Sequence, residues 1–276
     1  MLFSVIVPVY NEKDNINRLI YSLLNLKFDD GEHELIIVDN NSSDETLSVL
    51  LQYEGKIKAA SENKQGSYAA RNRGINKSSG AYLCFTDGDC AVDENWLLKA
   101  QETIERGDPD LIAGKVINTE PKKNLYAIYD DLCFLKQDQM VKRKSAATAN
   151  LIVSREVFEV AGMFDAEMMT GGDKEFTKRA VNQGFKLVYN DQVIVYHKSR
   201  SSFSDIRKKL SRFWLDSKKF KNTLKKISGL CLMPGIKTLT RAAINKEIGF
   251  ITYLQLLAVS FFLGLSVSIQ VLFGKN

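Results

Sequence analysis

The 276-residue chain contains only four cysteines, and no two of them form a Cys-x-x-Cys pair. This spacing speaks against a structural zinc site, and the small number fits a reducing compartment. No basic segment precedes the first apolar stretch, so we expect no signal peptide. An internal repeat and a low-complexity tract are also missing. What remains is the composition of a globular protein with an ample core.

Two nucleotide-binding signatures are absent as well. A Rossmann site needs Gly-x-Gly-x-x-Gly after its first strand, and a P-loop needs Gly-x-x-x-x-Gly-Lys-Ser/Thr. The first predicted strand, residues 4–10, is followed instead by Asn11 and Glu12. A sugar-phosphate nucleotidyltransferase would be expected to carry a glycine-rich loop at this point, so that class is disfavoured too.

Short apolar runs alternate with amphipathic segments along the chain. The runs predicted as strands are residues 4–10, 35–38, 57–60, 81–85, 111–116, 149–153 and 193–196. Between them we predict helices, one of which opens with a capping box at residues 42–45 and another with Asp93 as its cap. This alternation predicts an α/β fold with a mostly parallel sheet and right-handed crossovers.

Two acids, Asp87 and Asp89, follow the apolar run 81–85 with Gly88 between them. Ligands of a parallel sheet bind beyond the carboxyl ends of its strands. Paired acids repel each other there, and a divalent cation removes that repulsion, because Mg²⁺ is typically held by one or two carboxylates plus substrate phosphates. The pattern predicts a metal–diphosphate site, and its alternative is an Asp-Gly turn with solvated acids.

Further polar groups should lie in the same crevice, beyond the carboxyl ends of the strands. Residues 8–12 and Asp39 also follow strands, and the intervening segment carries Lys64, Arg71 and Arg73. A guanidinium there can hold phosphate oxygens, whereas a solvated helix face is the alternative for both arginines. Small neighbours indicate either close approach of a bulky group or tight helix–sheet packing; they are Gly66, Ala69 and Ala70.

Four segments carry a more specific signal when taken in order. They are Val-Ile-Val-Pro-Val-Tyr-Asn-Glu (5–12), Ile-Ile-Val-Asp-Asn-Asn-Ser-Ser-Asp-Glu-Thr (36–46), Ala-Ala-Arg-Asn-Arg-Gly (69–74) and Phe-Thr-Asp-Gly-Asp-Cys (85–90). Over roughly the first two hundred residues the chain resembles the inverting family 2 glycosyltransferases of GT-A fold. The resemblance implies a Rossmann-like sheet flanked by helices and a nucleotide-diphosphate-sugar donor.

The resemblance also implies roles for individual residues. The expected nucleotide-sugar contacts are Pro8, Tyr10, Glu12, Asp39, Asn41, Lys64, Gly66, Arg71, Asp87 and Gly88. By the family pattern, Arg71 would lie near the diphosphate and Asp87 near the ribose. Asp89 would bind Mg²⁺ or Mn²⁺, and His197 would complete the metal site. A lone histidine at a strand end is otherwise more often structural.

The segment 170–176 places Asp173 behind two glycines at the start of a predicted helix. Its position alone favours a helix cap. The resemblance implies instead that Asp173 is the catalytic base, which takes the proton of the acceptor hydroxyl as that oxygen attacks the anomeric carbon. The family often has Glu-Asp where this chain has Gly172-Asp173, so the acceptor contact is expected at Gly172 and Glu175.

Residues 200–226 are dense in Lys and Arg with aromatic residues interleaved, namely Phe203, Phe213, Trp214 and Phe220. Such a stretch can bind nucleic acid, but the acid-rich crevice does not fit that use. We therefore expect no nucleic-acid partner and predict an amphipathic helix on an anionic membrane surface.

No charged side chain occurs from Ile248 to Gly274. That length can span a hydrocarbon core, and a buried or interfacial helical hairpin is the alternative. Three cationic residues precede the segment, whereas only Lys275 follows it. The positive-inside bias then predicts a membrane-associated enzyme with its catalytic domain on the cytoplasmic side.

We therefore expect a GT-A catalytic domain over residues 1–203, basic membrane-proximal helices over 204–247 and a transmembrane or membrane-inserted segment over 248–274. The Gln-x-x-Arg-Trp motif of processive synthases fails at two positions of residues 209–213. Transfer of one sugar to a lipid-linked glycan, in cell-surface polysaccharide or glycolipid synthesis, is the favoured activity. A polyprenyl-phosphate acceptor and a non-catalytic sugar-nucleotide-binding protein are the alternatives.

Overall fold

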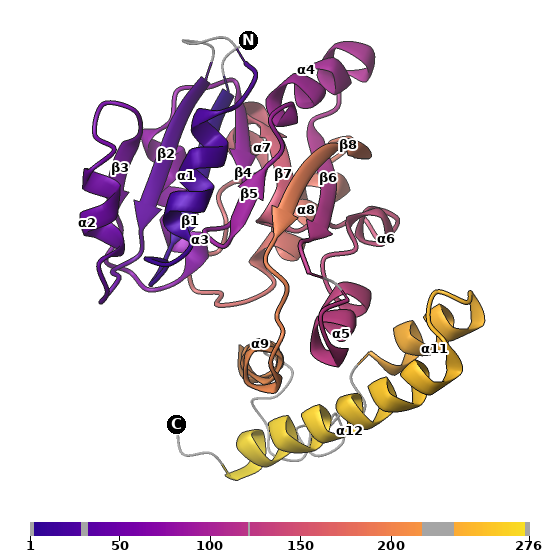
Figure 1. The fold of residues 1–276 in the computed structure, drawn as a ribbon. Coiled ribbons are helices and arrows are strands. Elements are labelled where there is room, and N and C mark those ends of the chain that lie inside the picture. Colours follow the sequence, from indigo (N-terminus) through magenta and orange to yellow (C-terminus); the bar gives the residue numbers. More distant parts are fainter. Residues whose placement is uncertain (1–2, 29–32, 121, 217–234, 274–276) are drawn as a thin grey trace. The chain divides into compact units, whose positions relative to one another are not determined.

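The computed structural model describes residues 3–28, 33–120, 122–216 and 235–273 (Figure 1). The chain divides into two compact units. Unit 1 comprises Met1–Ile117 and Lys136–His197, and unit 2 comprises Asn118–Leu135 and Lys198–Asn276. Residues 118–145 are thus shared between the units. The functional division at residues 203 and 247 stays a prediction.

Among the described residues, the sheet of unit 1 has eight strands in the order β3-β2-β1-β4-β7-β6-β8-β5. The strands are β1 (Phe3–Val9), β2 (His33–Asp39), β3 (Lys58–Ser61), β4 (Tyr82–Phe85), β5 (Cys90–Val92), β6 (Leu111–Asn118), β7 (Leu151–Ser154) and β8 (Leu187–His197). The pairs within β3-β2-β1-β4 are parallel, as the alternation predicted. Strand β7 pairs antiparallel with β4 and β6, and β5 pairs antiparallel with β8, so the sheet is mixed.

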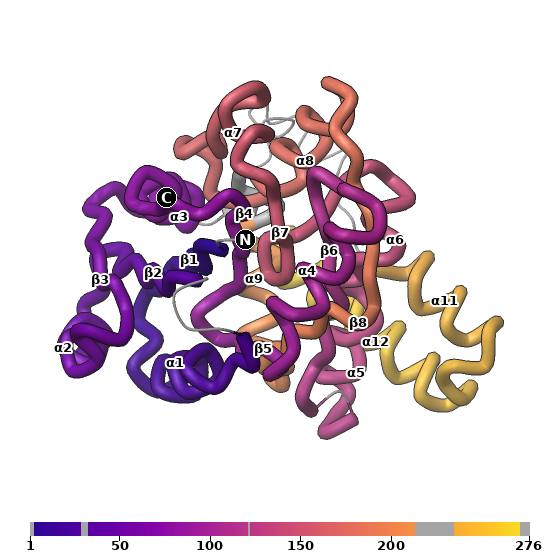
Figure 2. The backbone as a smooth tube through the Cα atoms, turned by 90° about the horizontal axis from the view of Figure 1, so that it is seen from above, coloured from indigo at the N-terminus to yellow at the C-terminus, as the bar shows by residue number. Residues whose placement is uncertain are grey.

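Helices cover both faces of this sheet (Figure 2). Their bounds are α1 (Ile16–Leu24), α2 (Thr46–Leu51), α3 (Ser67–Lys77), α4 (Trp96–Gly107), α6 (Gln137–Val141), α7 (Arg155–Ala161) and α8 (Gly172–Asn182), with a 3₁₀ turn at Thr148–Asn150. One apolar core joins the sheet to α1, α2 and α4, and a second joins it to α3, α7 and α8. Within β1, Val5 and Val7 enter the first core and Ile6 the second, because successive side chains of a strand point to opposite faces.

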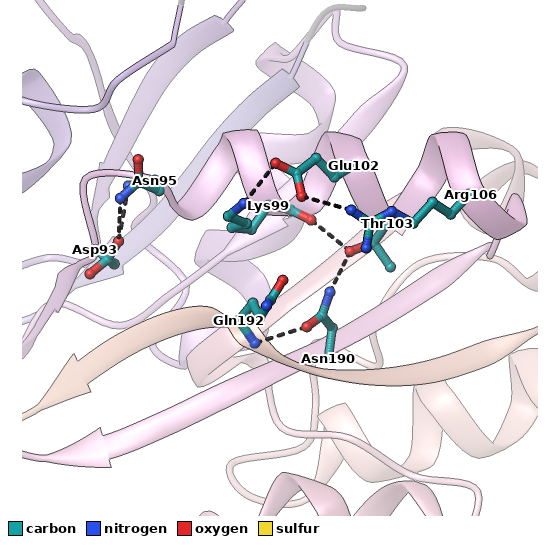
Figure 3. Close-up of polar contacts among 8 residues, drawn as sticks. All are labelled: Asp93, Asn95, Lys99, Glu102, Thr103, Arg106, Asn190 and Gln192. Atoms are coloured by element: carbon teal, nitrogen blue, oxygen red, sulfur yellow. Dashed lines mark hydrogen bonds and ion pairs between the residues drawn. The ribbon is translucent and has the colours of Figure 1, made fainter.

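Two helix starts differ from their predictions. The N-cap of α4 is Asn95, and the carboxylate of Asp93, the predicted cap, accepts a hydrogen bond from the Asn95 backbone N–H at 3.0 Å (Figure 3). The predicted capping box before α2 does not form either, since its N-cap is Glu45 without a side-chain bond. Local sequence shows that a helix start is near, but longer-range contacts decide which side chain serves it.

Unit 2 contains the helices α5 (Leu125–Cys133), α9 (Phe203–Asp216), α11 (Ile236–Ile244) and α12 (Phe250–Phe273). Tyr129, Ile206, Leu239 and Leu256 belong to its shared apolar core. The predicted amphipathic helix appears as α9. The side chains of Phe213 and Trp214, and all of Phe220, lie outside the described part of the chain.

Helix α12 is the one described helix that is long and apolar enough to cross a membrane. Its Phe250–Gln270 stretch has a mean hydropathy of 1.9, and only 28% of its apolar window is buried within the protein. Exposed apolar side chains line it, among them Phe250, Phe262 and Ile269. The fold therefore leaves much of this apolar surface without a protein partner in the described residues.

Candidate active site

The parallel strands bring three predicted site segments to one edge of the sheet. Val9 at the end of β1 is in register with Asp39 at the end of β2, and Ile6 is in register with Phe85 at the end of β4. Residues 10–12, 39–41 and 86–89 therefore leave their strands side by side. This is the carboxyl edge, where ligands of parallel sheets bind.

Asp39 is only 3% exposed, and its two carboxylate oxygens differ in their surroundings. Oδ2 accepts a hydrogen bond from the Ser42 backbone N–H at 3.2 Å, whereas the buried Oδ1 has no hydrogen-bond partner among the described residues. A buried acceptor without a donor is costly. The Asp39 Oδ1 atom is therefore ready to receive an N–H group from a ligand. Tyr10, at the end of the neighbouring strand, is 48% exposed.

A set of hydrogen bonds holds the loop after β1 against the loop after β2. The backbone N–H of Asn11 donates to Ser42 Oγ at 2.9 Å, and that of Glu12 donates to Thr46 Oγ1 at 2.8 Å. Asn11 and Asn41 both have positive φ values, 54° and 61°, which asparagine tolerates better than most residues. Ser42, which was expected to cap α2, thus helps to shape the predicted nucleotide cradle instead.

Asn40 organises the next loop, although sequence reasoning assigned it no role. Its side-chain amide donates to the backbone oxygens of Glu62 and Lys64 and accepts from the Gly66 N–H at 2.7 Å. Gly66 itself has a φ of 128°, which favours glycine. In the sequence, only its place in the motif around Asp39 points to Asn40, because the hydrogen-bond partners of Asn40 lie more than twenty residues away.

The two arginines of α3 have different environments. Arg73 is exposed, as a solvated helix face predicts, but the Arg71 side chain is only 4% exposed and pairs with Asp87 Oδ1 at 2.5 Å. The buried Nε of Arg71 has no partner among the described residues. Lys64 forms an ion pair with Glu167. Ala69 and Ala70 are buried, and a Cβ at Gly74, one turn further along α3, would lie 2.4 Å from Ile6 Cγ2, so this face of the helix packs tightly against the sheet.

Asp89 and His197 lie together because Cys90 and His197 pair in antiparallel register between β5 and β8. His197 Nε2 is 3.4 Å from Asp89 Oδ2, and His197 is 1% exposed. The described residues contain no group of three or more His, Cys, Asp or Glu side chains arranged to hold a metal ion. A carboxylate and an imidazole nevertheless fit a cation that takes its remaining ligands from a diphosphate and water. Gly88 packs closely, since a Cβ there would lie 3.1 Å from Glu12 Cγ.

Asp173 lies in the first turn of α8, whose N-cap is Gly171 with a φ of 74°. The alternative prediction, that Asp173 is the N-cap of this helix, is therefore wrong, because Gly171 occupies that position. Its Oδ1 accepts hydrogen bonds from the Tyr68 hydroxyl at 3.2 Å and the Lys174 N–H at 2.9 Å. Glu175, by contrast, is bound through both carboxylate oxygens to Arg179, at 2.9 and 3.0 Å.

A chain of contacts joins the carboxylates after β4 to the carboxylate on α8. Asp87 pairs with Arg71, the Arg71 guanidinium lies over the Tyr68 ring at 5.4 Å from its centroid, and the Tyr68 hydroxyl reaches Asp173. Residues predicted from separate motifs thus belong to one continuous cluster within unit 1. The cluster joins an anion-binding guanidinium to a partly exposed carboxylate, which suits a displacement on a phosphorylated ligand.

Comparison with known proteins relates this arrangement to described families. The family model "Glycosyl transferase family 2" matches residues 4–159. The glycosyltransferase AglE of Haloferax volcanii is 37% identical over 215 residues, which cover 76% of this chain and 70% of that protein. A dolichyl N-acetyl-α-D-glucosaminyl phosphate 3-β-D-2,3-diacetamido-2,3-dideoxy-β-D-glucuronosyltransferase of Methanococcus voltae is 25% identical over 217 residues, covering 72% of this chain and 67% of that protein.

Two solved structures resemble the fold. The crystal structure of S. aureus TarS residues 1–349 in complex with UDP-GlcNAc has a TM-score of 0.61 at 19% identity, covering 99% of this chain and 82% of that chain. The mannosyltransferase PcManGT of Pyrobaculum calidifontis in complex with GDP-Man and Mn²⁺ has a TM-score of 0.61 at 16% identity, covering 98% and 73%. At such identity the likeness shows the fold alone, and it confirms the predicted α/β fold of GT-A type.

Proposed function

This chain belongs to glycosyl transferase family 2, and from that premise we propose that it transfers a single sugar from a nucleotide-diphosphate-sugar to a hydroxyl of a lipid-linked glycan. As a family member it is a glycosyltransferase that uses a nucleotide-sugar donor. That membership removes the non-catalytic alternative. The proposal adds the acceptor class, the inverting displacement and the residues that carry it.

On the donor side, the unpartnered Oδ1 of Asp39 supports recognition of an N–H group of the nucleobase. Arg71, already paired with Asp87, would face the diphosphate. Asp89 and His197 would hold the divalent cation, and Mn²⁺ accompanies GDP-Man in the fold relative PcManGT. When bound, such a cation supplies positive charge that stabilises the departing diphosphate.

On the acceptor side, Asp173 would take the proton of the attacking hydroxyl, and a single displacement would invert the anomeric configuration. The observation that carries the proposal is the contact chain from Asp87 through Arg71 and Tyr68 to Asp173. It holds a donor-binding group and a carboxylate base in one cluster. Gly172 and Glu175 remain proposed acceptor contacts, although Arg179 engages both oxygens of Glu175.

Two features support a lipid-linked acceptor and membrane attachment. The relative from Methanococcus voltae is named for a dolichyl-phosphate-linked acceptor. In unit 2, a groove of about 520 Å³ is lined mainly by apolar side chains of α9 and α12, and of the described residues that line it Arg207 alone is charged. Apolar walls beside one cation match the chain and phosphate of a lipid. We place the protein at a membrane with unit 1 on the cytoplasmic side.

The proposal is tested with the purified full-length chain, a panel of nucleotide-sugars and a polyprenyl-diphosphate-linked sugar. Release of nucleoside diphosphate is measured with Mn²⁺ and after chelation. We expect one preferred donor, metal-dependent transfer and an inverted product. Replacing Asp173 with Asn should slow transfer by about 10²- to 10⁴-fold, because a positioned base contributes roughly that much. The matched control is Asp191→Asn, an exposed carboxylate on β8.

Two results would speak against this reading. Absence of nucleoside diphosphate release from every donor would overturn the proposed reaction. Full turnover by Asp173→Asn would overturn the role of the base and favour the polyprenyl-phosphate alternative, because that acceptor is already an anion and needs no deprotonation.

A further inference from the structure

Tyr68 on α3 directly precedes the Ala-Ala-Arg-Asn-Arg-Gly motif and is placed against Asp173 by the fold. The two residues are 105 positions apart, yet the Tyr68 hydroxyl donates a hydrogen bond to Asp173 Oδ1 at 3.2 Å. Tyr68 is only 5% exposed, so solvent does not compete for this bond. The proposed base therefore has a buried tyrosine hydroxyl as a hydrogen-bond donor, and we ask what this donor does for the reaction.

The ring of Tyr68 is held by three neighbours. The Arg71 guanidinium lies 5.4 Å from its centroid, and the Phe164 ring lies 5.8 Å away in a tilted arrangement. Gly172 supplies the third contact, since a Cβ at this position would come within 2.8 Å of Tyr68 Cε2. The ring therefore fills the space that a side chain at position 172 would need. This gives a physical reason for Gly-Asp where the family often has Glu-Asp.

The hydroxyl of Tyr68 remains protonated at every working pH. Burial, followed by the negative charge of Asp173, raises the pKa of Tyr68 well above its usual range, and the positive charge of Arg71 opposes this only in part. The hydroxyl is consequently always available as a donor, and Asp173 is always its acceptor when ionised.

The two oxygens of Asp173 are used unequally. Oδ1 accepts both the Tyr68 hydroxyl and the Lys174 N–H, whereas no hydrogen bond reaches Oδ2 from the part of the chain that the structure describes. The carboxylate is thus fixed through one oxygen while the other remains open. That division is what a base needs, because its orientation is set without blocking the atom that accepts the proton.

We propose that Tyr68 is a positioning residue for the catalytic base: its hydroxyl holds Asp173 Oδ1 and thereby presents Oδ2 to the acceptor hydroxyl. The inference rests on the proposed function of Asp173. In the reaction, Asp173 Oδ2 gains the proton of the acceptor and Tyr68 keeps its own. Gly172 serves the same arrangement by leaving room for the ring.

The test is Tyr68→Phe, which keeps the ring and removes the hydroxyl alone. We expect kcat for sugar transfer to fall about 10-fold, since a hydrogen bond to a charged group is lost, while the donor KM changes less than about twofold. Because the hydroxyl orients the base and does not bind the donor, this split between kcat and the donor KM is the readout of a positioning role.

The control is Tyr82→Phe, which removes a hydroxyl at the amino end of β4, at the opposite end of that strand from Asp87. It should leave kcat and the donor KM unchanged. If Tyr68→Phe does not fold, Gly172→Ala provides the second variant, because its methyl group displaces the ring and should lower kcat in the same way. The acceptor KM of this variant should stay within about twofold of wild type, and a rise in that KM alone would assign the effect to acceptor binding and overturn the inference.

The outcomes separate the two proposals. If Asp173→Asn abolishes transfer but Tyr68→Phe keeps the wild-type kcat, Tyr68 has no positioning role and the proposed function stands. A loss of thermal stability alone, with kinetics unchanged, overturns the inference equally. If Asp173→Asn retains full activity, the base itself is misassigned and the inference falls with it.

Discussion

Among the described residues, a few buried side-chain polar atoms have no hydrogen-bond partner. Asp39 is the sharpest case, because a carboxylate oxygen that is buried without a donor loses hydration and gains nothing in return. Ser42 satisfies only the other oxygen. A ligand that brings an N–H group to Asp39 Oδ1 would remove this penalty, which is the physical basis of the proposed contact between Asp39 and the donor.

We predict that Asp39→Asn weakens donor binding by about 10- to 100-fold, since one charge-assisted hydrogen bond is lost and an NH₂ group can face the ligand N–H. Titration calorimetry with the nucleoside diphosphate measures the affinity. At saturating donor, kcat should remain within a few-fold of wild type. The exposed Asp14→Asn is the control. Unaltered affinity of Asp39→Asn would show that this carboxylate does not contact the nucleotide.

Motifs locate the acids of the site, whereas contacts between distant residues decide how each is used. Asp87, Asp89, Arg71 and Asp173 were expected from the motifs and the family resemblance. The fold adds the Arg71–Asp87 ion pair and the Tyr68 hydroxyl on Asp173. The difference between buried Arg71 and exposed Arg73 depends on which face of α3 meets the sheet. Such partners cannot be predicted from spacing along the chain, because the pairs are formed by packing of separate elements.

At the scale of elements, the alternating pattern predicted the parallel strands β1 to β4 because each is a short apolar run. Strand β5, with only three residues, was missed, since so short a segment shows no period. The predicted capping box before α2 was wrong, because Ser42 Oγ instead accepts a hydrogen bond from the backbone of the loop after β1. A side chain that can cap a helix can equally bind a neighbouring loop, and the sequence does not rank these uses.

Helix α12 gives a prediction at this scale. Phe262, which is 59% exposed, lies on α12 in the wall of the groove with Arg207. Replacing Phe262 with Asp should reduce binding of the full chain to vesicles containing anionic lipid about 10-fold or more, because apolar burial is lost and a charge is brought to the lipid surface. Flotation with labelled vesicles measures the bound fraction.

The matched control is Val160→Asp on α7, since Val160 is also 59% exposed but belongs to unit 1. It should float as the wild type does. Equal losses in both variants would mean that the added charge acts nonspecifically, and no loss in Phe262→Asp would exclude this part of α12 from membrane contact.

At the scale of the whole molecule, unit 1 has its proposed site at one end of the parallel strands and a stabilising hydrogen-bond network at the other end. The predicted site residues follow the carboxyl ends of β1, β2 and β4, while a hydrogen-bonded carboxylate lies near the amino ends of these strands. Glu34 on β2 accepts from Ser4 on β1, from Lys58 on β3 and from Ser79 before β4. One side chain thus joins four neighbouring parts of the parallel half, at the end of the sheet away from the proposed reaction.

This arrangement predicts how the protein responds to acid. Burial alone would raise the pKa of Glu34, but hydrogen bonds from Lys58, Ser4 and Ser79 outweigh it and lower the pKa from 4.5 to about 2. Because the folded pKa lies below the unfolded one, the ionised carboxylate stabilises the fold fully above pH 4.5. Because the ion-pair partner Lys58 is mostly exposed, solvent screening reduces that contribution to about 1–2 kcal/mol, and it is lost as the pH falls from 4.5 towards 2.

Glu34→Gln should therefore lower the free energy of unfolding near pH 7 by about 1–2 kcal/mol, and the gap to wild type should shrink to less than about half of its neutral value by pH 3. Urea unfolding followed by circular dichroism across this range measures both curves. Glu159→Gln, an exposed carboxylate on α7, should follow the wild type throughout. Activity per folded molecule should be unchanged, because the network lies away from the carboxyl edge. A difference in unfolding free energy that stays constant with pH would mean that Glu34 stabilises the strands by its shape and not by its charge.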